Sequence, residues 1–315
     1  MKNNTNDIYD ILIIGAGPGG MTAAIYGARA MAKIAMIEKG APGGKMTKTS
    51  EIENYPGFDS IQGPELSMKM FMQTQNLNIP YLGDRVVNIT KQIDSNLFEL
   101  KLFSGKILLS KVVIIATGTV ERKIGVPGEL ELYGRGVSYC AVCDGALFKN
   151  KDILVVGGGY AALEEALYLT KFVNKVYLVH RRQEFRADDN LLAKAKKNPK
   201  IEFILDSVVT KINDPKANKV TSVMIKNVKD NTEQELVVSA VFPYIGSIPI
   251  TDFVKDLNVL DENGYVITNS RCETKVPGLF AAGDVTNTTL RQIATAVSDG
   301  AKAAQFAIEY IDNLK

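Results

Sequence analysis

Histidine, cysteine and tryptophan are scarce in this chain, whose 315 residues include one histidine, three cysteines and no tryptophan. A single imidazole excludes histidine-rich metal sites and any mechanism that needs two histidines. Three cysteines cannot form the disulfide framework that cross-links small secreted domains. In a reducing compartment, a close cysteine pair is more typical of catalysis or metal binding than of structure.

Excess charge and long apolar runs are also missing. The 37 Lys and Arg residues nearly balance the 35 Asp and Glu residues, giving a net charge of +2, which argues against a dedicated nucleic-acid binder. The apolar run Ile11 to Ile14 is far shorter than the ~20 residues of a membrane span. The polar start has no apolar segment typical of a secretion signal. We therefore expect a soluble, cytoplasmic protein without a membrane partner, built from about two domains of ~150 residues.

One glycine-rich motif occurs twice, at a constant offset of 142 residues. In each copy an apolar run of strand length leads into Gly-x-Gly-x-x-Gly/Ala, and a helix-prone segment follows. A second strand-like run then comes at 34–37 and at 176–179. This order predicts two βαβ units, and therefore an α/β fold with two Rossmann-like dinucleotide-binding domains.

The small residues of each motif have distinct physical roles. The first glycine permits a tight turn, the second lets a pyrophosphate approach the backbone, and the third small residue lets helix and strand pack closely. The helix N-terminus then offers N–H groups to the phosphates. The second copy continues with Tyr160 and Ala161, which supply no small hydroxyl or carboxamide for phosphate contact. The predicted contacts are Gly15, Gly17, Pro18 and Gly20 in the first copy, and Gly157, Gly159 and Ala162 in the second.

The residues that follow the second strand of each unit distinguish the two ligands. Glu38, followed by Lys39, ends the first unit, and an acid there accepts hydrogen bonds from ribose hydroxyls and repels a 2′-phosphate. This favours FAD or NAD. The matching position of the second unit is His180, followed by Arg181, Arg182 and Arg186. Guanidinium groups grip a 2′-phosphate, so this loop predicts NADPH, although a solvated basic loop is the alternative. For His180 we expect a stacking or positioning role.

A C-x-x-C pair, Cys140 and Cys143, lies between the two glycine motifs and is followed directly by Asp144. The spacing suits a small reversible disulfide ring. Zinc is disfavoured because no second pair exists to complete four ligands, so we expect no metal; an inert buried pair is the other alternative. Asp144 could hold the protons that a cycling dithiol exchanges, or it could cap a turn. Cys272 stands alone and is expected to take no part.

These motifs resemble the low-molecular-weight thioredoxin reductases, a class of FAD- and NADPH-dependent flavoproteins, over nearly the whole chain. The C-x-x-C-Asp segment inside the second nucleotide unit is the most specific of them. The other matching segments are Glu53-Asn54-Tyr55-Pro56-Gly57, Ala116-Thr117-Gly118, His180-Arg181-Arg182, Phe185-Arg186-Ala187, and the stretch from Gly278 to Gly283-Asp284-Val285.

The resemblance implies FAD at the first site, with Asp284 bonded to the ribityl chain and residues 291–293 beside the isoalloxazine. Two departures stand out. Lys45 replaces the usual Gln and could stabilise anionic reduced flavin or point to solvent, and Gly246-Ser247-Ile248-Pro249-Ile250 replaces Gly-His-x-Pro-Asn. The cofactor contacts that the resemblance adds are Gly43, Gly44, Lys45, Asn54, Thr117, Gly118, Gly246, Gly283, Asp284, Arg291, Gln292 and Ile293.

The motif order also predicts the domain plan. Residues 1–119 and 247–315 would form the FAD domain, interrupted by an NADPH domain, 120–246, that carries the cysteines. The two connecting segments contain glycine and proline and make a plausible hinge. In the low-molecular-weight thioredoxin reductases, the NADPH domain rotates relative to the FAD domain, so that the cysteines and the nicotinamide reach the flavin in turn.

The implied activity is thioredoxin-disulfide reduction by a homodimer, with thioredoxin as the protein substrate. Cys143 would face the flavin, Cys140 would attack the substrate disulfide, and Asp144 would manage the protons. Three alternatives remain open. The chain could be an NADPH-dependent reductase of ferredoxin or a quinone, which would not need the cysteines; it could be a non-enzymatic redox sensor; or it could use NADH as the donor.

Overall fold

The computed structural model describes residues 8–49, 52–92, 94–214 and 218–314, without the side chains of residues 48, 142 and 143. The chain divides into two compact units. Unit 1 comprises residues 1–120 and 248–315, and unit 2 comprises residues 121–247. The chain therefore leaves unit 1 once, forms unit 2, and returns.

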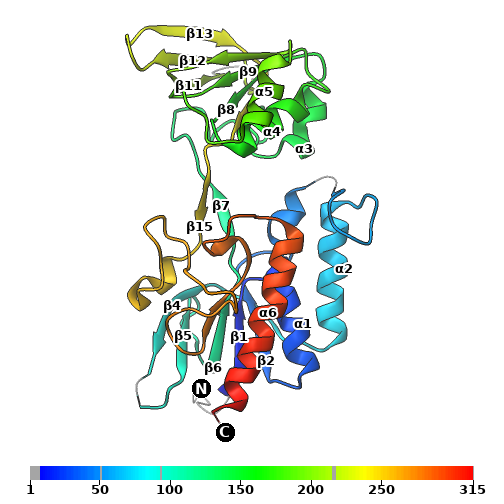
Figure 1. The fold of residues 1–315 in the computed structure, drawn as a ribbon, viewed down its shortest axis with the longest axis vertical. Helices are drawn as coiled ribbons and strands as arrows, with labels where there is room; N and C mark the ends of the chain where they lie inside the picture. The colour runs from blue at the N-terminus through cyan, green and yellow to red at the C-terminus, as the bar shows by residue number, and fades with distance from the viewer. Residues whose placement is uncertain (1–7, 50–51, 93, 215–217, 315) are drawn as a thin grey trace. The chain divides into compact units, whose positions relative to one another are not determined.

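Unit 1 is built on a seven-stranded sheet with the order β3-β2-β1-β6-β5-β4, in which β16 also pairs with β6 (Figure 1). The first βαβ unit is present as predicted, because β1 runs parallel to β2 and places Ile11 beside Ile34. The strands are β1 (Ile8–Ile14), β2 (Ile34–Glu38), β3 (Tyr81–Gly83), β4 (Val86–Lys91), β5 (Phe98–Leu102), β6 (Ile107–Ile115) and β16 (Leu279–Ala281).

Two cores cover the two faces of this sheet. Ile11 and Ile13 of β1 face a core shared with three helices, which lie side by side in Figure 1: α1 (Pro18–Arg29), α2 (Gly63–Asn76) and α6 (Ile293–Asp312). Leu12 and Ile14 face a second core with β4, β5 and the short helix η3 (Asp252–Leu257). The strand alternates as a pleat requires, and both of its faces are apolar because both are covered.

The closest helix contact in unit 1 depends on small residues. A Cβ at Gly300 of α6 would lie 2.1 Å from the carbonyl oxygen of Gly19 in α1. Ala304, Ala307 and Ile311 continue the buried stripe that the apolar spacing of this helix indicates. α6 therefore packs tightly against the helix that starts at the first glycine motif.

Unit 2 contains a parallel sheet of order β10-β9-β8-β14 and an antiparallel sheet of order β11-β12-β13. Its helices are α3 (Ala141–Asp144), η2 (Gly145–Phe148), α4 (Tyr160–Leu169) and α5 (Asp189–Lys197). The second βαβ unit is formed by β8, α4 and β9, as predicted. The strands are β8 (Asp152–Val156), β9 (Lys175–Val179), β10 (Ile201–Ile204), β11 (Ser207–Asn213), β12 (Ser222–Asn227), β13 (Glu233–Val237) and β14 (Val241–Pro243).

The two crossings between the units pair with each other as β7 (Thr119–Glu121) and β15 (Ser247–Pro249). Beside them, the N–H of Arg122 donates to the carbonyl of Gly246 at 2.9 Å. Gly246 has a φ of +111°, a conformation that a side chain would strain.

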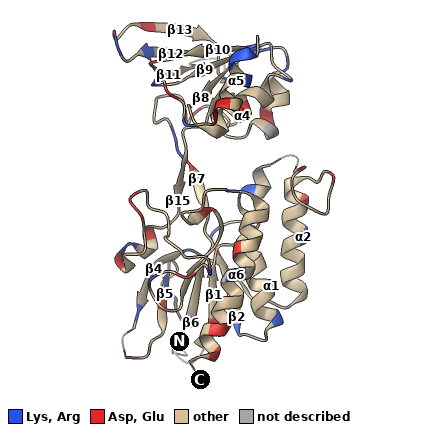
Figure 2. Ribbon diagram, viewed as in Figure 1, with Lys and Arg blue, Asp and Glu red and all other residues tan. Residues whose placement is uncertain are grey.

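Acidic and basic residues are interspersed over both units (Figure 2). The most basic helix end is the last turn of α5, where Lys194, Lys196 and Lys197 are exposed. Within the described ranges, every helix is too short or too polar to cross a bilayer.

Candidate functional site

The first glycine motif forms a turn between β1 and α1 whose glycines meet different surroundings. Gly15 has a φ of +106°, and a Cβ there would lie 2.3 Å from the carbonyl oxygen of Ala116. A Cβ at Gly20 would lie 1.9 Å from the carbonyl oxygen of Gly15. At Gly17, by contrast, no described atom lies within 4 Å of an added Cβ. Gly15 and Gly20 are therefore required by the fold, and Gly17 leaves open space at the start of α1, which continues with Pro18.

The second motif repeats this arrangement between β8 and α4. Gly157 has a φ of +151°, and a Cβ there would lie 2.3 Å from the carbonyl oxygen of Tyr244. Among the described atoms, none lies within 4 Å of a Cβ added at Gly159. Ala162 fits fully buried at the third position. Each turn thus leaves one open position beside a helix N-terminus, which is the shape that a pyrophosphate needs.

Glu38, at the end of β2, lies beside the first turn. One carboxylate oxygen accepts the N–H of Ala16 at 3.1 Å, and the other accepts the N–H of Gly40 at 3.0 Å. The carboxylate is thereby fixed at the carboxyl end of the sheet and keeps lone pairs for a ribose hydroxyl. Lys39 beside it is exposed.

The paired glycines that follow β2 pack on the first turn. The N–H of Gly43 donates to the carbonyl of Ala16 at 2.7 Å, and a Cβ at Gly44 would lie 3.5 Å from the Cα of Gly17. Both glycines have positive φ angles, +115° and +58°. This segment therefore forms one wall of the space beside Gly17.

Lys45 turns toward the acidic residue of the last sequence motif. Its ammonium donates to Thr119 Oγ1 at 2.6 Å and lies 3.8 Å from a carboxylate oxygen of Asp284. Burial raises the pKa of Asp284, while the charges of Lys45 and Arg291 act in the opposite direction. The structure therefore places the Lys45 ammonium beside Thr119 and Asp284, while 45% of its side chain stays exposed.

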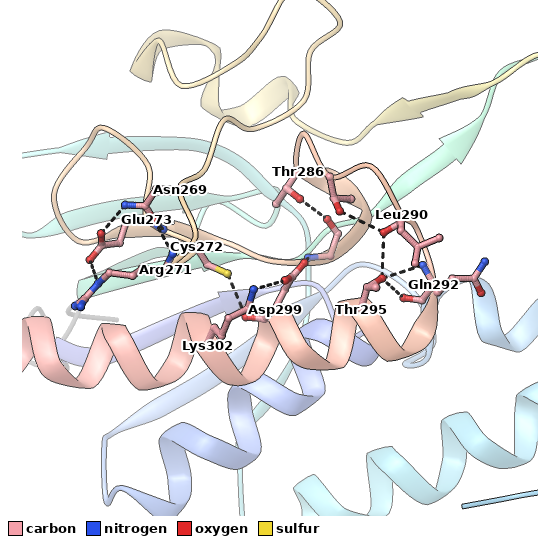
Figure 3. Close-up of polar contacts among 12 residues, drawn as sticks. Asn269, Arg271, Cys272, Glu273, Thr286, Leu290, Gln292, Thr295, Asp299 and Lys302 are labelled. Carbon is pink, nitrogen blue, oxygen red and sulfur yellow. Dashed lines mark hydrogen bonds and ion pairs between the residues drawn. The ribbon is translucent and has the colours of Figure 1, made fainter. Parts of the chain in front are cut away.

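Other predicted contacts of unit 1 gather at the first turn of α6, where Figure 3 shows the side chains of Gln292 and Thr295. Asn54 donates from Nδ2 to Gln292 Oε1 at 3.1 Å, and Thr295 Oγ1 accepts the N–H of Gln292 at 3.1 Å. Arg291 donates from Nε to the carbonyl of Asp284 at 3.3 Å. Ile293, which opens the helix, is partly buried against the core.

Two further segments complete the carboxyl end of this sheet. Thr117 Oγ1 donates to the carbonyl of Ile250 at 2.7 Å, and the carbonyl of Gly118 accepts the N–H of Ile250 at 3.1 Å. Gly283, at the start of η4 (Gly283–Val285), donates its N–H to Asp299 Oδ2 at 3.4 Å. The predicted unit 1 residues therefore belong to segments far apart in the sequence, and the fold brings these segments together at one end of one sheet.

In unit 2 the arginine loop adjoins the second glycine turn. The N–H of Arg186 donates to the carbonyl of Gly158 at 2.7 Å. The side chains of Arg181, Arg182 and Arg186 are exposed. The loop therefore presents three cations beside the open position at Gly159.

The His180 side chain packs between this loop and the second glycine turn. A Cβ at Gly158 would lie 2.2 Å from the imidazole of His180. The Nε2 atom of His180 lies 3.0 Å from the carbonyl oxygen of Glu184. Burial and the nearby arginine charges lower the pKa of His180, against the opposing effect of the Glu184 contact. The buried His180 ring therefore supports the loop, and Gly158 is a required glycine that the sequence interpretation missed.

The cysteine segment is held by backbone hydrogen bonds. Cys140 is disulfide-bonded; the side chain of Cys143 lies outside the described part of the structure. The N–H of Cys140 donates to Ser138 Oγ at 3.1 Å, and the N–H of Ala141 donates to Tyr244 Oη at 2.7 Å. Asp144 ends α3 and is partly buried, and its carboxylate does not cap the following helix η2.

Cys272 differs from Cys140 in its bonding and in its burial. It is free and buried, and its thiol donates to the carbonyl of Asp299 at 3.6 Å (Figure 3). Burial, followed by the charge of Asp299, raises the pKa of Cys272 to about 11. The thiol is therefore protonated at neutral pH and unreactive.

Glu165 of α4 is a partly buried acid in unit 2 that the sequence did not single out. Burial, followed by the charge of Glu164, raises the pKa of Glu165 from 4.5 to about 7. A raised pKa means that the folded state binds the proton more tightly than the unfolded chain does. The contribution of this group to stability is therefore full below pH 4.5 and is lost as the pH rises to about 7.

Glu165→Gln is expected to remove this dependence of stability on pH. Between pH 5 and pH 8, the unfolding free energy of the variant should rise relative to that of the natural protein by about 2–3 kcal/mol. Urea unfolding of the two proteins at both pH values measures the difference, and Glu164→Gln, at an exposed neighbour, is the control with a smaller effect. A difference that does not change with pH would contradict the buried-acid assignment.

Comparison with known proteins agrees with this geometry. Residues 9–300 match the family model described as pyridine nucleotide-disulphide oxidoreductase. The chain is 48% identical over 310 residues to the thioredoxin reductase of Listeria innocua, which covers 98% of this chain and 95% of that protein. It is 48% identical over 309 residues to that of Bacillus subtilis, with 98% and 96% covered.

Solved structures extend the likeness to three dimensions. The crystal structure of Lactococcus lactis thioredoxin reductase superposes with a TM-score of 0.82 at 46% identity, covering 97% of this chain and 99% of that one. The thioredoxin reductase of T. acidophilum superposes with a TM-score of 0.79 at 37% identity, with 98% and 99% covered. The chain therefore belongs to the pyridine nucleotide-disulphide oxidoreductase family and, within it, to the low-molecular-weight thioredoxin reductases.

Proposed function

We propose that the chain catalyses the reduction of oxidised thioredoxin by NADPH, with bound FAD carrying the electron pair from the nicotinamide to a Cys140–Cys143 disulfide. The observation that carries the proposal is the disulfide at Cys140 in the same unit as the second glycine turn. The names of the relatives supply thioredoxin as the substrate. As in the resembling family, we expect a homodimer.

The unit 1 site fits a dinucleotide with a free adenosine ribose. The open position at Gly17 and the N-terminus of α1 would take the pyrophosphate. Glu38 would accept the ribose hydroxyls, since its carboxylate is already fixed by backbone N–H groups. The cluster of Lys45, Asp284 and Arg291 would hold the middle of the cofactor, and the first turn of α6 would lie along the ring system.

The unit 2 site fits NADPH. The open position at Gly159 would take the pyrophosphate at the start of α4. Arg181, Arg182 and Arg186 would bind the 2′-phosphate by charge-assisted hydrogen bonds. Tyr160 begins the helix with an exposed ring, so the phosphate donors there are backbone N–H groups.

The cysteine pair performs the exchange chemistry. In the dithiol form, the Cys140 thiolate attacks one sulfur of the substrate disulfide, and the other substrate sulfur leaves as a thiolate. The Cys143 thiolate then attacks Cys140 in the mixed disulfide, which closes the internal disulfide and releases the second substrate thiolate. Asp144, partly buried at the end of α3, would exchange the protons.

The direct test is an assay of the purified protein with FAD, NADPH and oxidised thioredoxin. The proposal predicts NADPH oxidation that depends on thioredoxin and produces free thiols. NADPH oxidation that ignores thioredoxin but proceeds with ferredoxin or a quinone would overturn it. Binding of both nucleotides without any turnover would instead indicate the redox sensor.

Substitution of the arginine loop tests the coenzyme assignment. Arg181→Ala combined with Arg182→Ala should raise the KM for NADPH by on the order of 100-fold or more, because each guanidinium–phosphate bond contributes about 1.5–3 kcal/mol and each 1.4 kcal/mol is about tenfold. The KM for NADH should stay the same, since NADH has no 2′-phosphate. The matched control removes two exposed lysines of the same unit, Lys196→Ala with Lys197→Ala. If KM for NADPH is equal in both double variants, the arginine loop does not bind the phosphate.

A further inference from the structure

Tyr244 follows β14 and forms part of the wall of the second glycine turn. Its N–H donates to the carbonyl of Val156 at 2.7 Å. Its own carbonyl oxygen packs against Gly157 so closely that a Cβ there would lie 2.3 Å away. The backbone of Tyr244 is therefore fixed at the turn that we assign to the pyrophosphate.

The side chain of Tyr244 reaches in the other direction, to the cysteine segment. Its Oη accepts the N–H of Ala141 at 2.7 Å. Ala141 directly follows Cys140, is 1% exposed, and opens the four-residue helix α3. The first N–H groups of a helix have no partner within it, and water does not reach this one, so the phenol oxygen supplies the acceptor that the helix lacks.

A second anchor from the same strand holds the other side of Cys140. The N–H of Ser138 donates to the carbonyl of Val241 in β14 at 3.0 Å. Ser138 Oγ accepts the N–H of Cys140 at 3.1 Å and donates to its carbonyl at 3.3 Å. Ser138 itself is buried. Cys140 is therefore held between two contacts that both lead back to β14, one of them through the Tyr244 phenol.

We propose that Tyr244 is a positioning residue for the redox disulfide, which it holds in its oxidised geometry through the Ala141 N–H. The inference rests on the proposed redox role of Cys140. The hydrogen bond is present while Cys140 is disulfide-bonded. Opening of the ring removes the covalent link from Cys140 to Cys143, so we expect the peptide that joins Cys140 to Ala141 to be less ordered in the dithiol. The phenol therefore stabilises the disulfide more than the dithiol.

Tyr244→Phe tests this with little change in shape. Removal of the oxygen leaves the buried Ala141 N–H without its acceptor, chiefly in the oxidised state. The disulfide of the variant should be easier to reduce, with a shift in the equilibrium against dithiothreitol on the order of tenfold, or about 30 mV for a two-electron couple. The measurement uses the FAD-loaded protein, with thiols counted after equilibration in graded redox buffers.

The matched control is Tyr139→Phe, one residue before Cys140. The Tyr139 hydroxyl donates to Glu129 Oε1 at 2.6 Å and not to α3, so the loss of its oxygen should leave the disulfide equilibrium unchanged. A Tyr244→Phe protein with the same equilibrium as the natural protein overturns the inference and leaves the proposed function intact. A natural protein whose disulfide never titrates overturns the proposed function itself.

Hydrogen exchange supplies a second readout that needs no variant. If Tyr244 holds the oxidised geometry, the backbone amides of residues 138–145 in the natural protein should exchange faster after reduction of the disulfide. The antiparallel sheet of β11, β12 and β13, in the same unit, is the internal reference and should not change. Equal protection of residues 138–145 in the two redox states would overturn the inference even if Tyr244→Phe failed to fold.

Discussion

Serine in place of Cys140 is expected to lower thioredoxin reduction by on the order of 10³-fold or more, because a serine hydroxyl can neither form a disulfide nor attack one as a thiolate. Transfer of electrons from NADPH to an artificial acceptor such as a dye should remain, since that reaction needs the nucleotide sites alone. Steady-state turnover of Cys140→Ser with each acceptor, on protein of equal FAD content, measures both effects.

Cys272→Ser is the control for this prediction. Cys272 is buried, with its thiol directed at the carbonyl of Asp299, and its pKa is raised to about 11, so its loss should leave thioredoxin reduction within about twofold. A Cys140→Ser protein that still reduces thioredoxin at a rate near that of Cys272→Ser would show that the electrons bypass the cysteine pair.

Gly20→Ala is expected to prevent FAD binding by displacing α1. The added Cβ would lie 1.9 Å from the carbonyl oxygen of Gly15, and a backbone atom cannot move aside as a flexible side chain can. A backbone clash in a packed core costs about 3 kcal/mol or more, which lowers the thermal midpoint of a domain of this size by roughly 6–12 °C. Thermal unfolding and the flavin absorbance of the purified variant report the two effects.

Gly17→Ala, in the same turn, separates an effect on FAD binding from an effect on folding. The φ of Gly17 is −78°, and no described atom lies within 4 Å of its added Cβ, so this variant should fold with an unchanged midpoint in the absence of FAD. Its affinity for FAD should still fall by roughly tenfold, about 1.4 kcal/mol, because the methyl group enters the space assigned to the pyrophosphate. Full FAD affinity in Gly17→Ala would place the cofactor elsewhere.

The sequence was sufficient to predict the two βαβ units, because their signals are local. An apolar strand, a Gly-x-Gly turn and a helix N-terminus follow one another within a few residues, and both units formed with parallel strands. The buried stripe of α6 was predictable for the same reason, since small residues recur at helical spacing. The contacts assigned to the cofactors remain predictions that the open glycine positions support.

The remaining features depend on contacts between residues far apart in the chain. Tyr244 and Ala141 are separated by 103 residues, and no pattern in the sequence pairs a tyrosine with the N–H of one particular alanine. In the sequence, Gly158 stands between two motif glycines and has no evident role of its own. Only the His180 imidazole packed against it shows why a larger residue is excluded. The raised pKa of Glu165 likewise follows from burial, which the spacing of apolar and polar residues along α4 does not reveal.

Anaerobic titration of the FAD-loaded protein with NADPH tests whether electrons pass from NADPH through a flavin to the Cys140 disulfide. The flavin and the disulfide each accept two electrons, so the natural protein should take up about twice as much NADPH per flavin as Cys140→Ser before reduction is complete, and it should gain free thiols as it does so. Equal uptake by the two proteins, without new thiols, would contradict the account.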